Sequence, residues 1–291
     1  MDPDQKVIYS LIESFVKGTP RKEGQPGLLM ASLGLKPREM ISLVGAGGKT
    51  TLMFRLAKEL LLNGKKVVTT TTTKIMEPVP AETAFLFVDP DEEELKQFVG
   101  RHLEQYGHLT IARERIGSGK LKGISPNLVD DLWRSNRMDY LIVEADGAAG
   151  LPVKAPRERE PVIPSCTTLV VSLLGVDGVG VELNEENVFQ AERVSKLTEM
   201  EMGAKMTDEA MAILVTHPEG LFKGAPSSSR VVAFLNKVDV PDGVVKGKGV
   251  AREILKKGLP QIERVVLGQL KNEPPVAEVV FPSNPQSNKR R

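Results

Sequence analysis

The sequence contains one cysteine and three histidines. Cys166 is the only cysteine among 291 residues, so no disulfide can form within the chain and a zinc site built on cysteines is excluded. The histidines His102, His108 and His217 are scattered and lack the spacing typical of metal ligands. A chain of this length buries about three-quarters of its unfolded surface, so apolar packing can stabilise it without a disulfide or a structural metal.

The chain also has no excess charge of one sign and no long apolar run. Its 39 basic and 38 acidic residues give a net charge of +1, which excludes a general polyanion-coating role and predicts no nucleic-acid partner. No apolar run approaches the length of a membrane span, and the first ten residues lack the pattern of a signal peptide. We therefore expect a cytoplasmic protein that does not bind membranes.

Strand and helix patterns alternate along most of the chain. We expect strands at 41–44, 66–72, 85–88, 109–112, 140–143, 169–174, 231–235 and 264–267, and helices at 50–62, 91–106, 126–135, 187–198, 208–215 and 250–257. This alternation predicts an α/β fold, a three-layer sandwich with a mainly parallel central sheet. The domain spans 39–271, after a helical extension and linker (1–38, with a helix at 8–16) and before a disordered, proline-rich tail (272–291).

A glycine-rich turn followed by lysine, residues 44–51 (VGAGGKTT), lies between an expected strand and an expected helix. Glycines let backbone N–H groups point at a phosphate without obstruction by Cβ atoms, and a helix start adds a positive dipole end. We expect Lys49 to contact the β- and γ-phosphates and the Thr50 hydroxyl to coordinate Mg²⁺. The expected phosphate-binding residues are Gly45, Ala46, Gly47, Gly48, Lys49, Thr50 and Thr51.

This turn is shorter than the usual phosphate loop, which has four residues between its first glycine and the Gly-Lys pair. Here Gly45 and Gly48 enclose only two residues, a spacing that resembles the short loop of Mur-type ligases. An ATP-dependent ligase or transferase therefore stays open beside a hydrolase. The simpler interpretation is a glycine-rich turn with an exposed lysine.

The apolar run 140–143 ends in two carboxylates, Glu144 and Asp146, which alternate and would share one face of a continuing strand. In phosphate-loop folds a neighbouring strand commonly ends in an acid near Mg²⁺ and the attacking water. We expect both residues to serve the metal and catalysis together with Lys49; the alternative is an acidic strand end that only turns the chain.

Five consecutive threonines, 69–73, precede Lys74. Threonine is β-branched and suits a strand, which explains most of the run. Its end would lie at the carboxyl edge of the sheet, where ligands bind in such folds. Thr72, Thr73 and Lys74 are therefore candidates for contact with a phosphate or a second substrate.

A guanine-recognition pattern, Asn-Lys-x-Asp, follows the expected strand 231–235. The Asp239 carboxylate would accept hydrogen bonds from guanine N1–H and N2–H₂, which adenine does not offer. Asn236 would contact the other edge of the base, and Lys237 would pack over it. GTP is therefore favoured over ATP, although a surface turn is the competing interpretation.

Several stretches together resemble the YqeC family, whose members are accessory proteins for selenium-dependent molybdenum hydroxylases. The stretches are 44–51 (VGAGGKTT), 70–75 (TTTTKI), 143–150 (VEADGAAG), 153–156 (VKAP), 160–164 (EPVIP) and 217–226 (HPEGLFKGAP). The resemblance spans about 40–238. It implies a phosphate-loop NTPase-like fold, a role in hydroxylase maturation, and as partners the client molybdenum hydroxylase or its cofactor-assembly proteins.

Three functions are open at this stage. The first is a Mg²⁺-dependent nucleotide hydrolase that prefers GTP and acts as a maturation switch. The second is the ATP-dependent ligase or transferase suggested by the short loop. The third is a non-catalytic protein that binds a nucleotide-bearing molybdenum cofactor.

Overall fold

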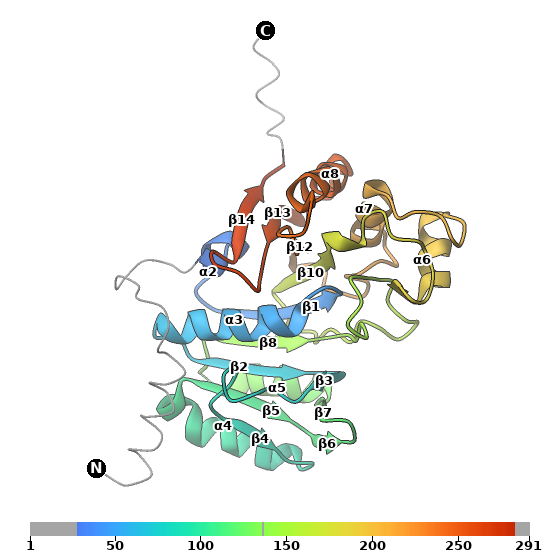
Figure 1. Ribbon diagram of the computed structural model, residues 1–291. Helices are drawn as coiled ribbons and strands as arrows, with labels where there is room; N and C mark the ends of the chain where they lie inside the picture. The colour runs from blue at the N-terminus through green and yellow to red at the C-terminus, as the bar shows by residue number, and fades with distance from the viewer. Residues whose placement is uncertain (1–27, 136, 283–291) are drawn as a thin grey trace.

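The computed structural model describes residues 28–135 and 137–282, so the helix expected at 8–16 lies outside the described residues. A nine-stranded sheet runs through the molecule in the order β14-β13-β12-β10-β1-β8-β2-β5-β4 (Figure 1). All neighbouring strands are parallel except β13 and β14, which are antiparallel. The strands are β1 (Glu39–Gly45), β2 (Val67–Thr71), β4 (Leu86–Val88), β5 (His108–Ala112), β8 (Tyr140–Glu144), β10 (Leu169–Gly175), β12 (Arg230–Asn236), β13 (Ile262–Gly268) and β14 (Val276–Val280).

Helices cover both faces of the sheet, which confirms the three-layer α/β sandwich. They are α2 (Leu28–Leu33), α3 (Lys49–Leu62), α4 (Glu92–Tyr106), α5 (Pro126–Ser135), α6 (Ala191–Thr198), α7 (Asp208–Thr216) and α8 (Gly243–Lys256). Odd-numbered residues of β1, such as Ile41 and Leu43, pack in a core with α2 and α3. Met40 and Val44, on the opposite face of the same strand, pack in the cores that contain α4, α5, α7 and α8.

The structure differs from the sequence prediction in several places. Helix α8 begins at Gly243, seven residues before the expected start at 250. Residues 188–189 form β11 (Val188–Phe189) with β9 (Val153–Lys154), and α6 starts only after them. The tail predicted to be disordered from 272 contributes β14, because its apolar residues 276, 279 and 280 extend the central sheet along β13.

A second small sheet lies beyond the carboxyl end of β2 (Figure 1). It consists of β3 (Lys74–Met76), β7 (Lys120–Lys122) and β6 (Glu114–Ile116), all antiparallel. Residues 117–122 are thus the turn and the second strand of a hairpin. No helix within 28–135 and 137–282 is long and apolar enough to cross a membrane.

A buried histidine in β5 gives the fold a pH dependence. His108 is almost fully buried, its Nε2 lies 3.1 Å from the Thr69 hydroxyl, and burial lowers its pKa to about 4. The unfolded chain takes up this proton near pH 6.5, so the neutral imidazole contributes stability above that pH. As the pH falls from about 6.5 to 4, the free energy of unfolding is expected to drop by about 3 kcal/mol.

Urea unfolding at several pH values between 4 and 8 measures this effect. His108→Gln should remove most of the slope, whatever its effect on absolute stability, because glutamine does not titrate. His217→Gln, at a half-exposed position, is the matched control and should keep the slope of the wild type. An unchanged slope in His108→Gln would assign the acid sensitivity to other groups.

Candidate functional site

The glycine-rich turn connects the carboxyl end of β1 to the start of α3, where two parallel neighbours, β8 and β10, flank β1. Gly45, Gly47 and Gly48 have φ values of +96°, +80° and +132°, which L-residues rarely adopt. A Cβ atom on Gly47 would lie 2.5 Å from the backbone nitrogen of Gly175 in β10. The turn is therefore specified by glycine for its conformation and for its close contact with the neighbouring strand.

Lys49 begins α3 and is almost fully buried beneath this turn. Its ammonium group donates to the carbonyl oxygen of Gly45 (2.6 Å) and lies 3.3 Å from Asp146 Oδ1 and 3.7 Å from Glu144 Oε1. Burial by itself lowers the pKa of Lys49. The negative charges of Asp146, which has the larger effect, and of Glu144 raise the pKa above its usual value. The lysine is therefore held as a cation beside the glycine-rich turn.

Glu144 and Thr50 form a pair of hard oxygen ligands at this site. The Thr50 hydroxyl donates to Glu144 Oε2 (2.7 Å), which brings an α3 oxygen and the last residue of β8 together. Burial raises the pKa of Glu144, while the charge of Lys49 opposes this shift. A hydroxyl and a carboxylate suit Mg²⁺, which usually takes one or two protein oxygens and completes its shell with phosphate and water. The described residues contain no group of three or more His, Cys, Asp and Glu that could hold a metal ion without such a ligand.

Asp146 has a different set of contacts from Glu144. It is fully buried, and its Oδ1 and Oδ2 accept hydrogen bonds from the Gly45 N–H at 3.1 and 3.0 Å. Its Oδ2 also lies 2.9 Å from the ammonium of Lys154 in β9. Asp146 therefore fixes the first glycine of the turn, although the sequence predicts that it shares the metal with Glu144.

Lys154 is a residue of this site that the sequence analysis missed. The basic and acidic stretch around 154–160 has the pattern of a solvated surface, yet Lys154 is 0% exposed. The signal available in the sequence was the VKAP stretch at 153–156, where lysine lies between small and apolar residues. Only the fold places this lysine against the carboxylate of Asp146.

The threonine run reaches the same edge of the sheet. The Thr72 N–H donates to the carbonyl of Glu144 (3.1 Å), and its hydroxyl donates to the carbonyl of Val162 (2.7 Å). Thr73 is half-buried beside it, and Lys74 is exposed on β3. Thr72 thus lies close to Glu144, whereas Lys74 belongs to the small antiparallel sheet. Contact of these three residues with a second substrate stays a prediction.

Asn236, at the end of β12, contacts the glycine-rich turn directly. Its side-chain amide donates to the carbonyl of Gly47 (2.7 Å), and its Oδ1 accepts from the Leu270 N–H (3.0 Å). The sequence pattern predicts that this side chain contacts a base, but one of its N–H groups and its oxygen form hydrogen bonds within the protein. Asn236 connects the turn after β1 to the loop after β13.

Lys237 and Asp239 lie at the outer edge of the site, in the loop after β12. Lys237 has a φ of +67°, and its ammonium is 2.6 Å from Asp177 Oδ2, in the 3-10 turn that follows β10. Asp239 is exposed and accepts from the Asn272 side-chain amide (3.0 Å). The loops after β12 and β13 therefore form one wall beside the glycine-rich turn, with the Asp239 carboxylate at its outer end.

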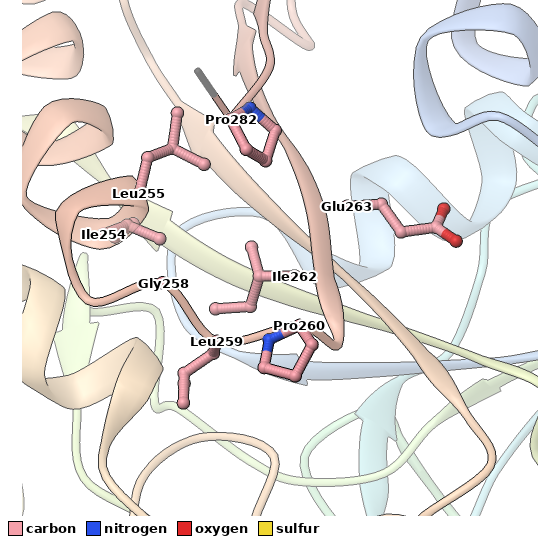
Figure 2. Close-up of a pocket in the computed structure, with 8 residues that line it drawn as sticks. All are labelled: Ile254, Leu255, Gly258, Leu259, Pro260, Ile262, Glu263 and Pro282. Carbon is pink, nitrogen blue, oxygen red and sulfur yellow. The ribbon is translucent and has the colours of Figure 1, made fainter. Parts of the chain in front are cut away.

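An apolar pocket of about 220 Å³ lies at a different place, between the end of α8 and the start of β13 (Figure 2). Ile254, Leu255, Leu259 and Ile262 contribute to its walls, and the one acidic lining residue, Glu263, forms an ion pair with Arg230. The amino end of β13 is opposite the carboxyl edge that carries Lys49. This pocket offers no cationic side chain to a phosphate and is separate from the candidate site.

Comparison of the sequence with known proteins gives two matches. A profile of the family described as YqeC protein matches residues 41–192. The uncharacterized protein YqeC of Escherichia coli (strain K12) is 31% identical over 255 residues, which cover 87% of this chain and 96% of that protein.

Comparison of the structure gives more distant similarities. The hydrogenase maturation factor HypB from Archaeoglobus fulgidus is similar over 91% of both chains, with a TM-score of 0.39 and 15% identity. The cell division protein ftsY from Thermotoga maritima is similar over 99% of this chain and 87% of its own chain, with a TM-score of 0.36 and 17% identity. At such TM-scores the assignment of a phosphate-loop NTPase-like fold rests on the strand order and on the turn between β1 and α3.

Proposed function

The chain belongs to the YqeC family, and from this premise and the geometry around Lys49 we propose that it binds a Mg²⁺-nucleotide and hydrolyses it, with GTP preferred over ATP. The observation that carries the proposal is the pairing of Thr50 with Glu144 (2.7 Å) beside a glycine-rich turn and a buried cationic lysine. These are the groups that a nucleoside triphosphate with its magnesium ion requires.

The residues of the site divide into binding and positioning roles. The N–H groups of Gly45 and Ala46 already donate to Asp146 and to the Leu173 carbonyl, so the backbone N–H groups of 47–50 and the Lys49 ammonium bind the β- and γ-phosphates. Thr50 and Glu144 hold Mg²⁺, which neutralises phosphate charge when it is bound. Asp146 keeps Gly45 in place through its two hydrogen bonds at 3.0 and 3.1 Å, and Asn236 does the same for Gly47.

The base lies against the wall formed by the loops after β12 and β13. Asp239 Oδ2 accepts one hydrogen bond from Asn272, and the lone pairs that remain on the two carboxylate oxygens can accept from guanine N1–H and N2–H₂. Adenine lacks this pair of donors, so a carboxylate facing it loses its hydrogen bonds. Asn236 joins this wall to the glycine-rich turn, so the elements that bind the base and the phosphates are connected by hydrogen bonds.

Asp239→Asn is the variant that tests the guanine assignment. It is expected to weaken binding of MgGTP by about 10- to 100-fold, the value of one or two hydrogen bonds to a charged group. The same change should improve binding of xanthosine triphosphate, because the new amide can donate to the carbonyl that xanthine carries at C2. Titration calorimetry of MgGTP, MgATP and magnesium xanthosine triphosphate measures all three affinities.

Asp242→Asn, three residues further along the same loop, is the matched control and should leave all three affinities unchanged. A preference for ATP that Asp239→Asn does not alter would contradict the guanine assignment. It would favour the ATP-dependent ligase or transferase indicated by the two-residue spacing between Gly45 and Gly48. Tight binding of GTP without release of phosphate would instead favour a non-catalytic binder of a nucleotide-bearing cofactor.

The cellular role that we propose follows from the family. A nucleotide-dependent switch of this kind would act as an accessory factor for a selenium-dependent molybdenum hydroxylase or for the proteins that assemble its cofactor. This role is tested by measuring the binding of purified hydroxylase to this protein, once in the presence of MgGTP and once in the presence of MgGDP. Binding that differs between the two nucleotides supports the role, and absence of binding in both states contradicts it.

A further inference from the structure

A fully buried lysine lies behind the glycine-rich turn. The Nζ atom of Lys154 is 2.9 Å from Asp146 Oδ2 and 3.0 Å from Glu160 Oε2. It also donates to the carbonyl of Gly147 (2.6 Å). A buried ammonium is stable when its three N–H groups have acceptors, and these three contacts supply them.

Asp146 is shared between this lysine and the glycine-rich turn. Its Oδ1 lies 3.3 Å from Lys49 Nζ, and both oxygens accept from the Gly45 N–H. A continuous line of contacts therefore runs from the turn through the fully buried Asp146 and Lys154 to Glu160, whose side chain is 13% exposed. Such interactions are strong in a low-dielectric interior, so a change at one end alters the balance at the other.

The far end of this line belongs to residues 147–163, which we name the rim segment. The carbonyl of Pro152 accepts from the Gly175 N–H of β10 (2.8 Å), and the carbonyl of Val162 accepts from the Thr72 hydroxyl next to β2 (2.7 Å). Residues 157–159 are exposed at its tip. The rim segment thus joins the carboxyl ends of separate strands to a solvent-facing surface.

We propose that Lys154 is a positioning residue that couples occupancy of the phosphate site to the conformation of the rim segment, an inference that rests on the proposed function. In the structure, Lys49 contributes to neutralising Asp146. A bound phosphate competes for the Lys49 ammonium, and Asp146 then depends more strongly on Lys154. The tighter Asp146–Lys154 pair draws the rim segment toward the turn, and the exposed tip at 157–159 reports the nucleotide state.

Amide hydrogen exchange of the full chain, with and without saturating MgGTP, tests the coupling. In the wild type, MgGTP should slow exchange in the rim segment by about threefold or more. Glu160→Gln keeps an oxygen acceptor but removes the charge at the end of the line. It should bind MgGTP within about threefold of the wild-type affinity. It should also lose most of the rim response, by which we mean the slowing of amide exchange in the rim segment when MgGTP binds. Glu253→Gln is the matched control, since Glu253 pairs with Lys256 on the surface of α8 (3.3 Å), and it should keep both properties.

Lys154→Gln is a second variant that acts at the centre of the line. It should remove the rim response and lower MgGTP affinity by about tenfold, because Asp146 loses the cation that positions it. A full rim response in Glu160→Gln or in Lys154→Gln would overturn the coupling, and so would a wild type that binds MgGTP without any rim response. A wild type that binds neither MgGTP nor MgATP would instead contradict the proposed function itself, which separates the two failures.

Discussion

Lys49→Ala is expected to lower the affinity for MgGTP by about 100-fold. A hydrogen bond from an ammonium to a phosphate contributes about 1.5–3 kcal/mol, and the charge of the lysine adds to it in a buried setting. Lys49 is almost fully buried between the Gly45 carbonyl and two carboxylates, so its position is fixed before any nucleotide binds. Titration calorimetry with the wild type and the variant measures the loss.

Two controls separate this effect from damage to the fold. Lys196→Ala removes an exposed lysine of α6 and should leave the affinity unchanged. Lys49→Ala should remain folded, because Asp146 keeps Lys154 as a partner at 2.9 Å and keeps its bonds to Gly45. An affinity within about threefold of the wild type would exclude Lys49 from phosphate binding.

Asp146→Ala is expected to reduce the free energy of unfolding by about 3–5 kcal/mol, the usual cost of removing one partner from a buried ion pair. Asp146 is fully buried and is the shared partner of Lys49 and Lys154. Its removal leaves the Gly45 N–H without its acceptor and leaves two ammonium groups with less compensating charge. Urea unfolding, followed by circular dichroism, gives the change in stability.

Glu104→Ala is the comparison at the surface. Glu104 forms an ion pair with Lys66, and its side chain is 79% exposed, so its removal should change stability by about 0–1 kcal/mol. A similar small change for Asp146→Ala would contradict the structural role given to this carboxylate. Asp146→Asn should fall between the two, because its amide keeps one acceptor oxygen for Gly45 and loses the charge.

The sequence by itself determined the elements whose signals are local. Residues 41–44 and 50–62 have the periodicity of a buried strand and of an amphipathic helix, and they appear as β1 and α3 with ends shifted by one or two residues. The glycines at 45, 47 and 48 predicted a turn between β1 and α3, and the structure has that turn, with positive φ at all three glycines. Such features depend on neighbouring residues, so a pattern of a few residues is enough to predict them.

The tertiary structure alone decided which distant residues meet around that turn. Asn236 reaches Gly47 across 189 positions of sequence, and Asp146 reaches Gly45 across 101. Lys154 has the pattern of a surface residue and becomes buried only because the fold places β9 beside Asp146, which follows β8. The short apolar segment of β14 lies amid prolines, and it becomes a strand because the edge of β13 offers unpaired backbone groups. Local patterns therefore fixed β1, α3 and the turn between them. The partners of each charge depended on strand order, which brings the carboxyl ends of strands that are remote in sequence to one edge of the sheet.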